Sequence, residues 1–541
     1  MNSNKKLFLV IFCLFFSIYA FSSDGHRSNS DESFLQEQAL RIVLQEPDPD
    51  FVPGKSGNLF KYPQFWYPRG DGATCAIGIF CYPVGIAHSF TAAPFVFLNH
   101  HFNFITDDSV TYDFYDFPDT HYVWWRNSIN PDFTFMELFY SPFFSSLSVA
   151  TFFLISRAFK YKISTSLSLA FLFGLTTTVF SFSQTSFNNA PAVFFVLAGF
   201  LFFKKFIDNQ KILNCIFASI LLGLGFMIRN DVIYAIVPLF FFLVLTVVFQ
   251  KKWTLSAILH KIVKIISFAI PLLLLYELNK TIEGARHLLV EQKLEMVGVD
   301  SMGADIASVA TSFGRAGMIH ADLSEGLFGL LLSPGVGLFV YVPILLTVFF
   351  AFPDFFKANK LFTILLLVIP SIFIIDFASM NLWHGFTAWS PKYLYIVIPF
   401  LLIPLGASIE KRGRTILPII CVLGGIGLFF NFVNIIQDVT WFVWGNPGGE
   451  GLMGLSAGRS CPLYICDEVI WTFQYSPLFA SIHVALNHLV LDVFLLKLFG
   501  VQYYFLALVS ILSAEFYLLY RILKSKNISR SESKSFAESN N

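Results

Sequence analysis

The chain has 541 residues, of which 55% are hydrophobic, 18% aromatic and only 13% charged, and its mean hydropathy is +0.64. A soluble protein carries roughly 25% charged residues, so this composition excludes a soluble globular protein and indicates a polytopic membrane protein. Basic and acidic residues balance at 36 each, and no basic patch with interleaved aromatic residues indicates nucleic-acid binding.

Apolar segments long enough to cross a bilayer follow one another along most of the chain. A transmembrane helix needs about 20 largely apolar residues. The candidates are residues 6–22, 141–158, 164–182, 189–203, 213–228, 232–249, 262–279, 327–350, 361–377, 393–408, 415–436 and 501–523. The sequence therefore predicts an all-α polytopic membrane protein with about twelve transmembrane helices.

The basic residues predict the orientation of these helices. Every second connection is basic, as with Lys160 and Lys162 after the second segment and Lys411 and Arg412 after the tenth. Because basic connections stay on the cytoplasmic side, both termini are predicted to be cytoplasmic. The first segment also fits a cleavable signal peptide, and that alternative leaves the later orientation unchanged.

This orientation places four loops outside the cytoplasm, namely 24–140, 280–326, 378–392 and 437–500. Within them, two apolar stretches contain polar or helix-breaking residues. We interpret residues 76–98 as re-entrant or interfacial and residues 484–499 as an amphipathic surface helix. The predicted organisation is a transmembrane module over 1–436 with interfacial helices in its first loop, a late loop over 437–500, a last helix over 501–523, and a disordered cytoplasmic tail over 524–541.

An acidic pair, Asp31-Glu32, directly follows the first apolar segment. Ser30 is a candidate N-cap, and SFLQEQALRIV then reads as a helix lying along the membrane surface. Acidic residues in a first helical turn interact favourably with the helix dipole, which is a purely structural explanation for one of them. Partial desolvation at the interface also raises the pKa of a carboxylate, as a general base requires.

Four further stretches, taken with the acidic pair, resemble the C-type glycosyltransferase (GT-C) superfamily, which includes protein O-mannosyltransferases and aminoarabinose transferases. They are SFSQTSFNNAPAVFFVLAGF (181–200), LLGLGFMIRNDVIYAIVPLFFF (221–242), GLFGLLLSPGVGLFVYVPILL (326–346) and NLWHGFTAWSPKYLYIVIPFLLIPLG (381–406). Their order along the chain carries the resemblance. One departure is Ser390-Pro391-Lys392, where the family usually has Gly-Pro-Arg, so the planar fork that grips phosphate is replaced by a lysine.

The resemblance implies an inverting glycosyltransferase that moves a sugar from a polyprenyl-phosphate donor to a glycan, lipid or protein acceptor on the extracytoplasmic face. It implies Asp31 as the base that deprotonates the acceptor, with Glu32 as the alternative or supporting acid. Arg229 and Lys392 are the candidates for holding the donor phosphate. The alternatives are an ion pair of Arg229 with Asp231 and a snorkelling role for Lys392.

Other candidate residues lie in the outer loops. Trp383 and His384 are candidates for contact with the sugar or acceptor, although tryptophan also belongs at membrane interfaces for physical reasons. Cys461 and Cys466 are a candidate disulfide in an oxidising compartment. No cysteine or histidine spacing indicates zinc, so no metal ligand is assigned, and neither a cofactor nor a divalent-metal requirement is established.

Two other classes of function compete with this interpretation. A transporter or lipid flippase of about twelve spans usually shows internal repeats and broken helices, and we find no repeat in this sequence. A non-catalytic scaffold subunit has no need for Asp31, Arg229 and Lys392 on one face. Substitution of these three residues separates an enzyme from a scaffold.

Overall fold

A computed structural model gives the three-dimensional structure of the protein. It describes residues 3–26, 35–36, 39–40, 42–44, 86–106, 130–249, 254–296, 322–380, 383–385, 389–436, 467–474, 476–487 and 491–538. The described residues form helices and contain no strand, which confirms the predicted all-α class.

The helices follow one another along the described parts of the chain. In chain order they are α1 (Ser3–Ser22), α3 (Ile86–Phe102), α5 (Pro131–Ala158), α6 (Ile163–Thr176), η5 (Ser181–Gln184), α7 (Asn189–Asn209), α8 (Ile212–Ile228), η6 (Asn230–Val232), α9 (Ile233–Val248), α10 (Leu255–Met296), α12 (Leu323–Leu332), α13 (Leu338–Tyr341), η8 (Pro343–Thr347), α14 (Val348–Ala358), α15 (Lys360–Ala378), η9 (Lys392–Val397), α16 (Ile398–Leu402), α17 (Leu405–Ile435), α19 (Asp467–Trp471), α20 (Pro477–Asn487) and α21 (Phe494–Glu538).

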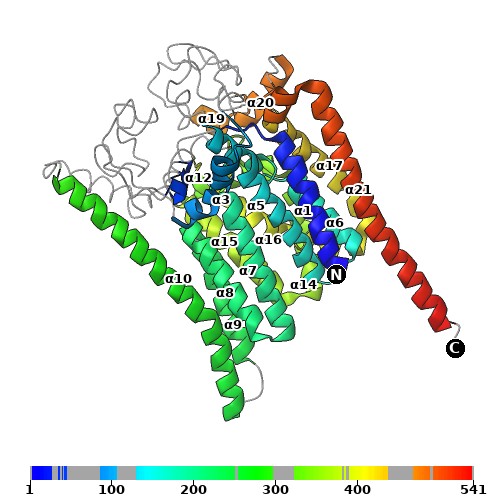
Figure 1. Cartoon of the computed structure of the whole chain (residues 1–541). Coiled ribbons are helices and arrows are strands. Elements are labelled where there is room, and N and C mark those ends of the chain that lie inside the picture. The colour runs from blue at the N-terminus through cyan, green and yellow to red at the C-terminus, as the bar shows by residue number, and fades with distance from the viewer. Residues whose placement is uncertain are drawn as a thin grey trace.

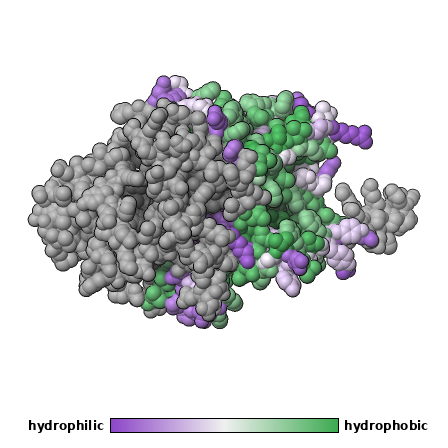
Figure 2. Space-filling view, turned by 90° about the horizontal axis from the view of Figure 1, so that it is seen from above, coloured by the Kyte–Doolittle hydropathy of each residue, from purple (hydrophilic) through white to green (hydrophobic). Residues whose placement is uncertain are grey.

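Eight of the described helical segments are long and apolar enough to cross a membrane, and four shorter apolar helices accompany them. The protein is therefore an integral membrane protein. Helices α5 and α7 form the centre of the bundle, with 78% and 72% of their most apolar windows buried, whereas α10 and α21 are only 11% buried. Figure 1 shows α10 and α21 on opposite flanks, and Figure 2 shows hydrophobic residues over much of the described surface.

Helix α21 is attached to the bundle mainly along α1. The Ser17 hydroxyl donates a hydrogen bond to Glu515 Oε1 at 2.9 Å, and the Tyr504 hydroxyl donates to the carbonyl of Phe21 at 2.8 Å. The N-terminal end of α1 and the C-terminal end of α21 both lie away from α3, α12, α19 and α20 (Figure 1). Helix α21 continues to Glu538, so it includes most of the stretch 524–541 that the sequence predicts to be a disordered tail.

Three of the predicted spans are interrupted in the structure. Residues 327–350 do not form one continuous helix, because α12 ends at Leu332 and the chain turns through Ser333 and Gly337 before α13 begins. Proline at 334 lacks the N–H that a continuing helix needs, which explains the break. Residues 393–408 are divided among η9, α16 and the start of α17. Beyond this span, the backbone of α17 leaves helical geometry at Arg412. Residues 164–182 are divided between α6 and η5.

The first loop contributes helical segments that pack on the bundle. Helix α3 covers the C-terminal part of the stretch interpreted as re-entrant or interfacial, and residues 35, 36, 39, 40 and 42–44 are also helical. Leu35, Ala39, Ala92 and Val96 are fully buried against α5 residues such as Met136. Because apolar side chains lose contact with solvent on both sides of this junction, the packing fixes these segments to the start of α5.

The predicted surface helix over 484–499 is wrong as a single element. Helix α20 ends at Asn487, residues 491–493 are not helical, and α21 begins at Phe494. Asp492 in this interruption is buried rather than exposed on a polar helix face. It has ion-pair partners in His26, at 2.7 Å, and Lys497, at 3.2 Å, and these contacts hold the backbone between the two helices.

The bundle has two ends, which are called the Arg229 end and the Asp354 end. Helix α5 has 28 residues and is therefore about 42 Å long. The Arg229 end is where α5 begins and α8 ends. The Asp354 end is where α5 ends, since the Phe159 ring contacts the Phe355 ring beside Asp354 at 5.4 Å.

Candidate functional site

Arg229 lies between α8 and the short helix η6, in the turn that joins α8 to α9. Its Nε and Nη2 atoms donate to the two oxygens of Asp231 at 3.0 and 2.5 Å. Both side chains are mostly buried, with 9% and 7% of their surfaces exposed. The ion pair that was the alternative explanation for Arg229 is thus confirmed.

Two asparagines connect Arg229 to the start of α7. Arg229 Nη1 donates to the side-chain oxygen of Asn188 at 3.0 Å and also to that of Asn189. A guanidinium has five N–H groups. These contacts use four of them, so protein side chains hold most of its hydrogen-bonding capacity.

Lys392 is brought to the same place through Asn189. The side-chain amide of Asn189 donates to the carbonyl of Lys392 at 3.4 Å. The Lys392 ammonium lies 4.0 Å from the centre of the Phe187 ring, and a cation over an aromatic face is held electrostatically. The structure therefore gathers the two predicted phosphate ligands, Arg229 and Lys392, around the segment 187–189.

Glu137 is a second buried charge at this end, in the second turn of α5. Only 1% of the residue is exposed. Its Oε1 atom accepts hydrogen bonds from Gln36 Nε2 and from the Ser186 hydroxyl, each at 2.7 Å. Burial of a carboxylate without hydrogen bonds is energetically costly. These two hydrogen bonds lower the cost of burying Glu137 in an apolar helix.

His88 of α3 lies beside the same segment. Burial lowers its pKa from 6.5 to about 3, although a hydrogen bond with the backbone of Ser186 acts in the opposite direction and the charge of Arg229 lowers it further. The His88 ring is therefore neutral at pH 7. Its neighbour Thr91 bonds to the Tyr140 hydroxyl at 2.8 Å, which links α3 to α5.

We refer to these residues together as the polar cluster. It consists of Gln36, His88, Glu137, Ser186, Asn188, Asn189, Arg229, Asp231 and Lys392. It joins the first-loop helices to α5, the start of α7, the α8–α9 turn and η9. The partly exposed Lys392 ammonium, together with Arg229, can interact with an anionic phosphate, whereas the carboxylates of Glu137 and Asp231 are buried and bonded to protein groups.

Several predicted site residues lie outside the described residues. They are the candidate base pair Asp31 and Glu32 and the disulfide candidates Cys461 and Cys466. The described chain resumes after the acidic pair at residues 35–36, and Gln36 belongs to the polar cluster. The roles assigned to the two acids and the two cysteines stay predictions.

Trp383 and His384 are buried, with 3% and 6% of each residue exposed. The Trp383 ring packs on α12 at Gly329, where a side chain in place of the glycine would collide with the ring. Burial lowers the pKa of His384 from 6.5 to about 4. In this arrangement both residues stabilise the junction of α12 with the 383–385 turn, and a contact with sugar or acceptor stays a prediction.

The sequence interpretation assigned no role to Glu137, Gln36, Asn188 or Asn189. The signal for Glu137 was present in PDFTFMELFYSPFF, where a single glutamate interrupts an apolar helical pattern. Asn188 and Asn189 lay inside a motif used for the family resemblance. Their contacts with Arg229 depend on the packing of α7 against α8, which no local pattern reveals.

A second group of charges lies where α1 ends and α21 begins. Asp24, His26 and Asp492 place three potential ligand atoms within 4.8 Å of one another. His26 has only 11% of its side chain exposed. Because the Lys497 ammonium lies 3.2 Å from Asp492, this group is an ion-pair network that fixes α21 to the residues after α1.

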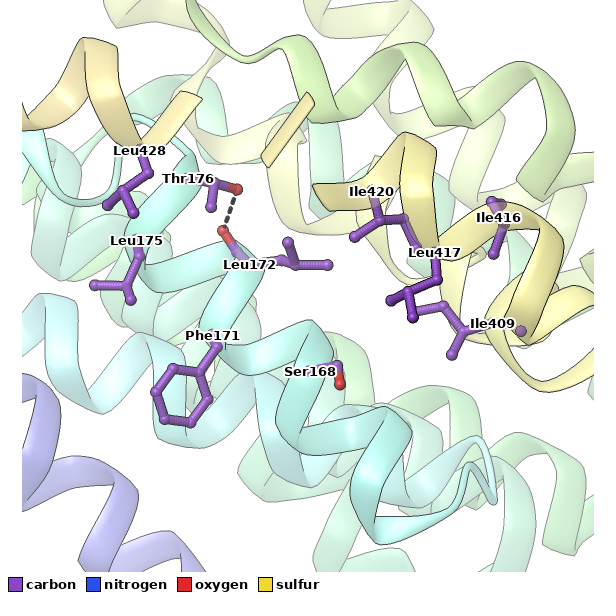
Figure 3. Close-up of a pocket in the computed structure, with 11 residues that line it drawn as sticks. Ser168, Phe171, Leu172, Leu175, Thr176, Ile409, Ile416, Leu417, Ile420 and Leu428 are labelled. Carbon is purple, nitrogen blue, oxygen red and sulfur yellow. Dashed lines mark hydrogen bonds between the residues drawn. The ribbon is translucent and has the colours of Figure 1, made fainter. Parts of the chain in front are cut away.

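A cavity of about 290 Å³ lies elsewhere, between α6 and α17. Figure 3 shows its lining, which includes the apolar side chains of Leu172, Ile416 and Ile420 and contains no titratable side chain. Ser168 and Thr176 are its polar residues, and the Thr176 hydroxyl already donates to the carbonyl of Leu172 at 2.8 Å. The lining of this cavity is mainly apolar and provides no catalytic side chain.

The fold and the polar cluster define a polytopic membrane protein whose buried charges gather at one end of the bundle. Residues 138–276 match the family model described as dolichyl-phosphate-mannose-protein mannosyltransferase. This match runs from α5 into α10 and includes Asn188, Asn189, Arg229 and Asp231. It supports a membrane glycosyltransferase of the GT-C kind, in agreement with the resemblance of the sequence motifs. No curated protein matches the chain.

Proposed function

We propose that the protein transfers a hexose or pentose from a polyprenyl-phosphate donor to a glycan, lipid or protein acceptor on the extracytoplasmic face of the membrane. The observation that carries this proposal is the convergence of Arg229 and Lys392 on the segment 187–189. Two cations at one end of a membrane bundle suit a lipid-linked phosphate, whose charge increases as the sugar departs.

In the proposed reaction Asp31 accepts the proton of the acceptor hydroxyl. The acceptor oxygen forms a new bond to the anomeric carbon, and the bond from that carbon to the phosphate oxygen breaks with inversion. The negative charge left on the polyprenyl phosphate interacts with Lys392 and with the remaining N–H of Arg229. Glu32 is the alternative base or supports Asp31. A disulfide between Cys461 and Cys466 would stabilise the late loop outside the cytoplasm.

The proposal places both termini in the cytoplasm and the Arg229 end outside it. The basic connections predicted from the sequence support this orientation. Lys204 and Lys411, which follow the fourth and tenth predicted spans, lie at the Asp354 end, since Lys204 contacts the Phe159 ring at 5.1 Å and Lys411 pairs with Asp354 at 2.6 Å. One side therefore collects the basic residues Lys204 and Lys411, while the other holds the polar cluster.

The test is sugar transfer by purified wild type and by Asp31→Asn, using radiolabelled polyprenyl-phosphate hexoses and pentoses and acceptor fractions from the host membrane. We expect transfer by the wild type and a loss of about 100-fold or more in Asp31→Asn, because general base catalysis contributes about that much. Equal transfer by both proteins would assign the base to Glu32 or elsewhere. No transfer and no saturable donor binding by the wild type would favour a transporter, flippase or scaffold.

A further inference from the structure

Glu137 links Gln36, which follows the predicted base in the sequence, to Ser186, which precedes the partners of Arg229. Through its Oε1 atom it joins two segments that are far apart in the sequence, one at Gln36 and one at Ser186. Its backbone carbonyl also accepts a hydrogen bond from the Ser23 hydroxyl, at 3.4 Å. One residue of α5 thus contacts the chain leaving α1, the first-loop helical residues and the segment before α7.

The two side-chain partners of Glu137 each lead directly to a proposed functional group. Gln36 follows Asp31 by five residues and Glu32 by four. Ser186 precedes Asn188 and Asn189, which accept hydrogen bonds from Arg229. The residues of this contact are all buried, with exposed fractions of 1% for Glu137, 2% for Gln36 and 1% for Ser186, so water competes little for these bonds.

We infer that Glu137 is a positioning residue for sugar transfer. Its carboxylate holds Gln36 and the 186–189 segment against α5, and thereby fixes the separation between the residue that follows the acidic pair in the sequence and the partners of Arg229. This inference rests on the proposed function. It assigns no proton transfer to Glu137, because both donors to Oε1 are protein groups and the carboxylate is enclosed.

The nature of these hydrogen bonds predicts how substitutions differ. Both partners donate to the same oxygen, and the side-chain carbonyl of glutamine offers a similar acceptor at a similar position. Glu137→Gln should therefore retain the positioning, whereas Glu137→Ala removes it. Misplacement of reacting groups by about 1 Å lowers rates by about 100-fold.

The experiment measures donor KM and kcat of wild type, Glu137→Gln, Glu137→Ala, Gln36→Ala and the Gln36→Ala/Glu137→Ala double variant. We expect Glu137→Gln to stay within about threefold of wild type and Glu137→Ala to lose about 10- to 100-fold in kcat. The double variant should be no worse than Glu137→Ala, because residues that act through one contact are not additive. Asp354→Asn is the matched control, a buried carboxylate at the opposite end, and its kcat per folded molecule should equal that of wild type.

A second measurement does not depend on activity. Amide hydrogen exchange of a peptide covering residues 35–44 should become faster in Glu137→Ala and stay unchanged in Asp354→Asn, because loss of an anchoring contact permits local opening. Unchanged exchange in Glu137→Ala, or equal loss of kcat in Glu137→Gln and Glu137→Ala, would overturn the positioning role. No transfer by the wild type with any donor would overturn the proposed function instead, and the exchange measurement would then decide alone whether Glu137 anchors this segment.

Discussion

Arg229 and Asp354 lie at opposite ends of the bundle, and each is held by several polar partners. Asp231, the ionic partner of Arg229, has 7% of its side chain exposed, and two asparagine side chains also accept hydrogen bonds from Arg229. The ionic partners of Asp354 are Lys411 and Arg412, whose side chains are 49% and 42% exposed. Both members of the Arg229–Asp231 ion pair are therefore buried, whereas the cations that pair with Asp354 reach water.

This difference in burial predicts at which end the loss of one charged partner destabilises the protein more. An ion pair whose cations reach water loses little when one partner is removed, because water replaces it. An enclosed pair leaves a buried, uncompensated charge. In the proposed function, this enclosure fixes the position of the Arg229 guanidinium, whose remaining N–H is assigned to the departing phosphate.

The largest effect is expected from Arg229→Ala. This change leaves Asp231 buried without its cation, and removal of one partner from such a pair costs about 3–5 kcal/mol of unfolding free energy. Thermal and denaturant unfolding of the purified protein in detergent measures the loss. Arg229→Lys, which keeps the charge but not the fork, should lie between wild type and Arg229→Ala. A variant Arg229→Ala as stable as wild type would show that the enclosure has no energetic consequence.

The next largest effect concerns acid. The pKa of His88 is lowered by burial to about 3 in the folded protein, below its ordinary value of 6.5. The unfolded chain therefore binds the proton first, and stability present above pH 6.5 is lost progressively as the pH falls towards 3. Thermal unfolding measured from pH 7 to pH 4 should decline less in His88→Gln than in wild type. Parallel declines would mean that other groups cause the acid sensitivity.

A smaller effect is expected from Lys392. Lys392→Met removes a cation beside the proposed phosphate position, and the donor KM should rise by about tenfold, equivalent to about 1.4 kcal/mol. Lys392→Arg keeps the charge and should restore a KM close to that of wild type. Unfolding should change little in either variant, since a cation–π contact at a partly exposed site contributes only about 0.5–1 kcal/mol. An unchanged KM in Lys392→Met would remove Lys392 from donor binding.

The smallest effect is expected from Asp354→Asn. Burial by itself raises the pKa of Asp354, but hydrogen bonds from Lys411, Arg412 and Ser408 lower it from 3.8 to about 2. The stability from this group is therefore present above about pH 4 and lost as the pH falls to about 2. At pH 7 the lowered pKa corresponds to about 2 kcal/mol. The variant should lose less than that, because the cations remain hydrated and an amide oxygen still accepts their hydrogen bonds. A loss as large as that of Arg229→Ala would contradict the comparison of the two ends.

The sequence predicted local features of the candidate site better than its assembly. The Arg229–Asp231 contact was foreseen as an alternative because the two residues are separated by one position in a turn. No local pattern predicts the contacts of Glu137 with Gln36 and Ser186, because hydrogen bonds between distant segments depend on how the first-loop residues and the segment before α7 pack against α5. The helix predicted over 484–499 was wrong because Asp492 is held by His26, from the other end of the chain.

The sequence by itself determined that this is an all-α membrane protein and where most of its long apolar helices lie, since helix length and hydropathy follow directly from the need to cross an apolar layer. Hydropathy did not determine which helices are central. The most apolar windows of α5 and α10 have mean hydropathies of 1.6 and 2.0, yet 78% of the first and 11% of the second is buried. Lipid and protein interiors are both apolar, so only the tertiary structure decided which helices surround the polar cluster and which face the membrane.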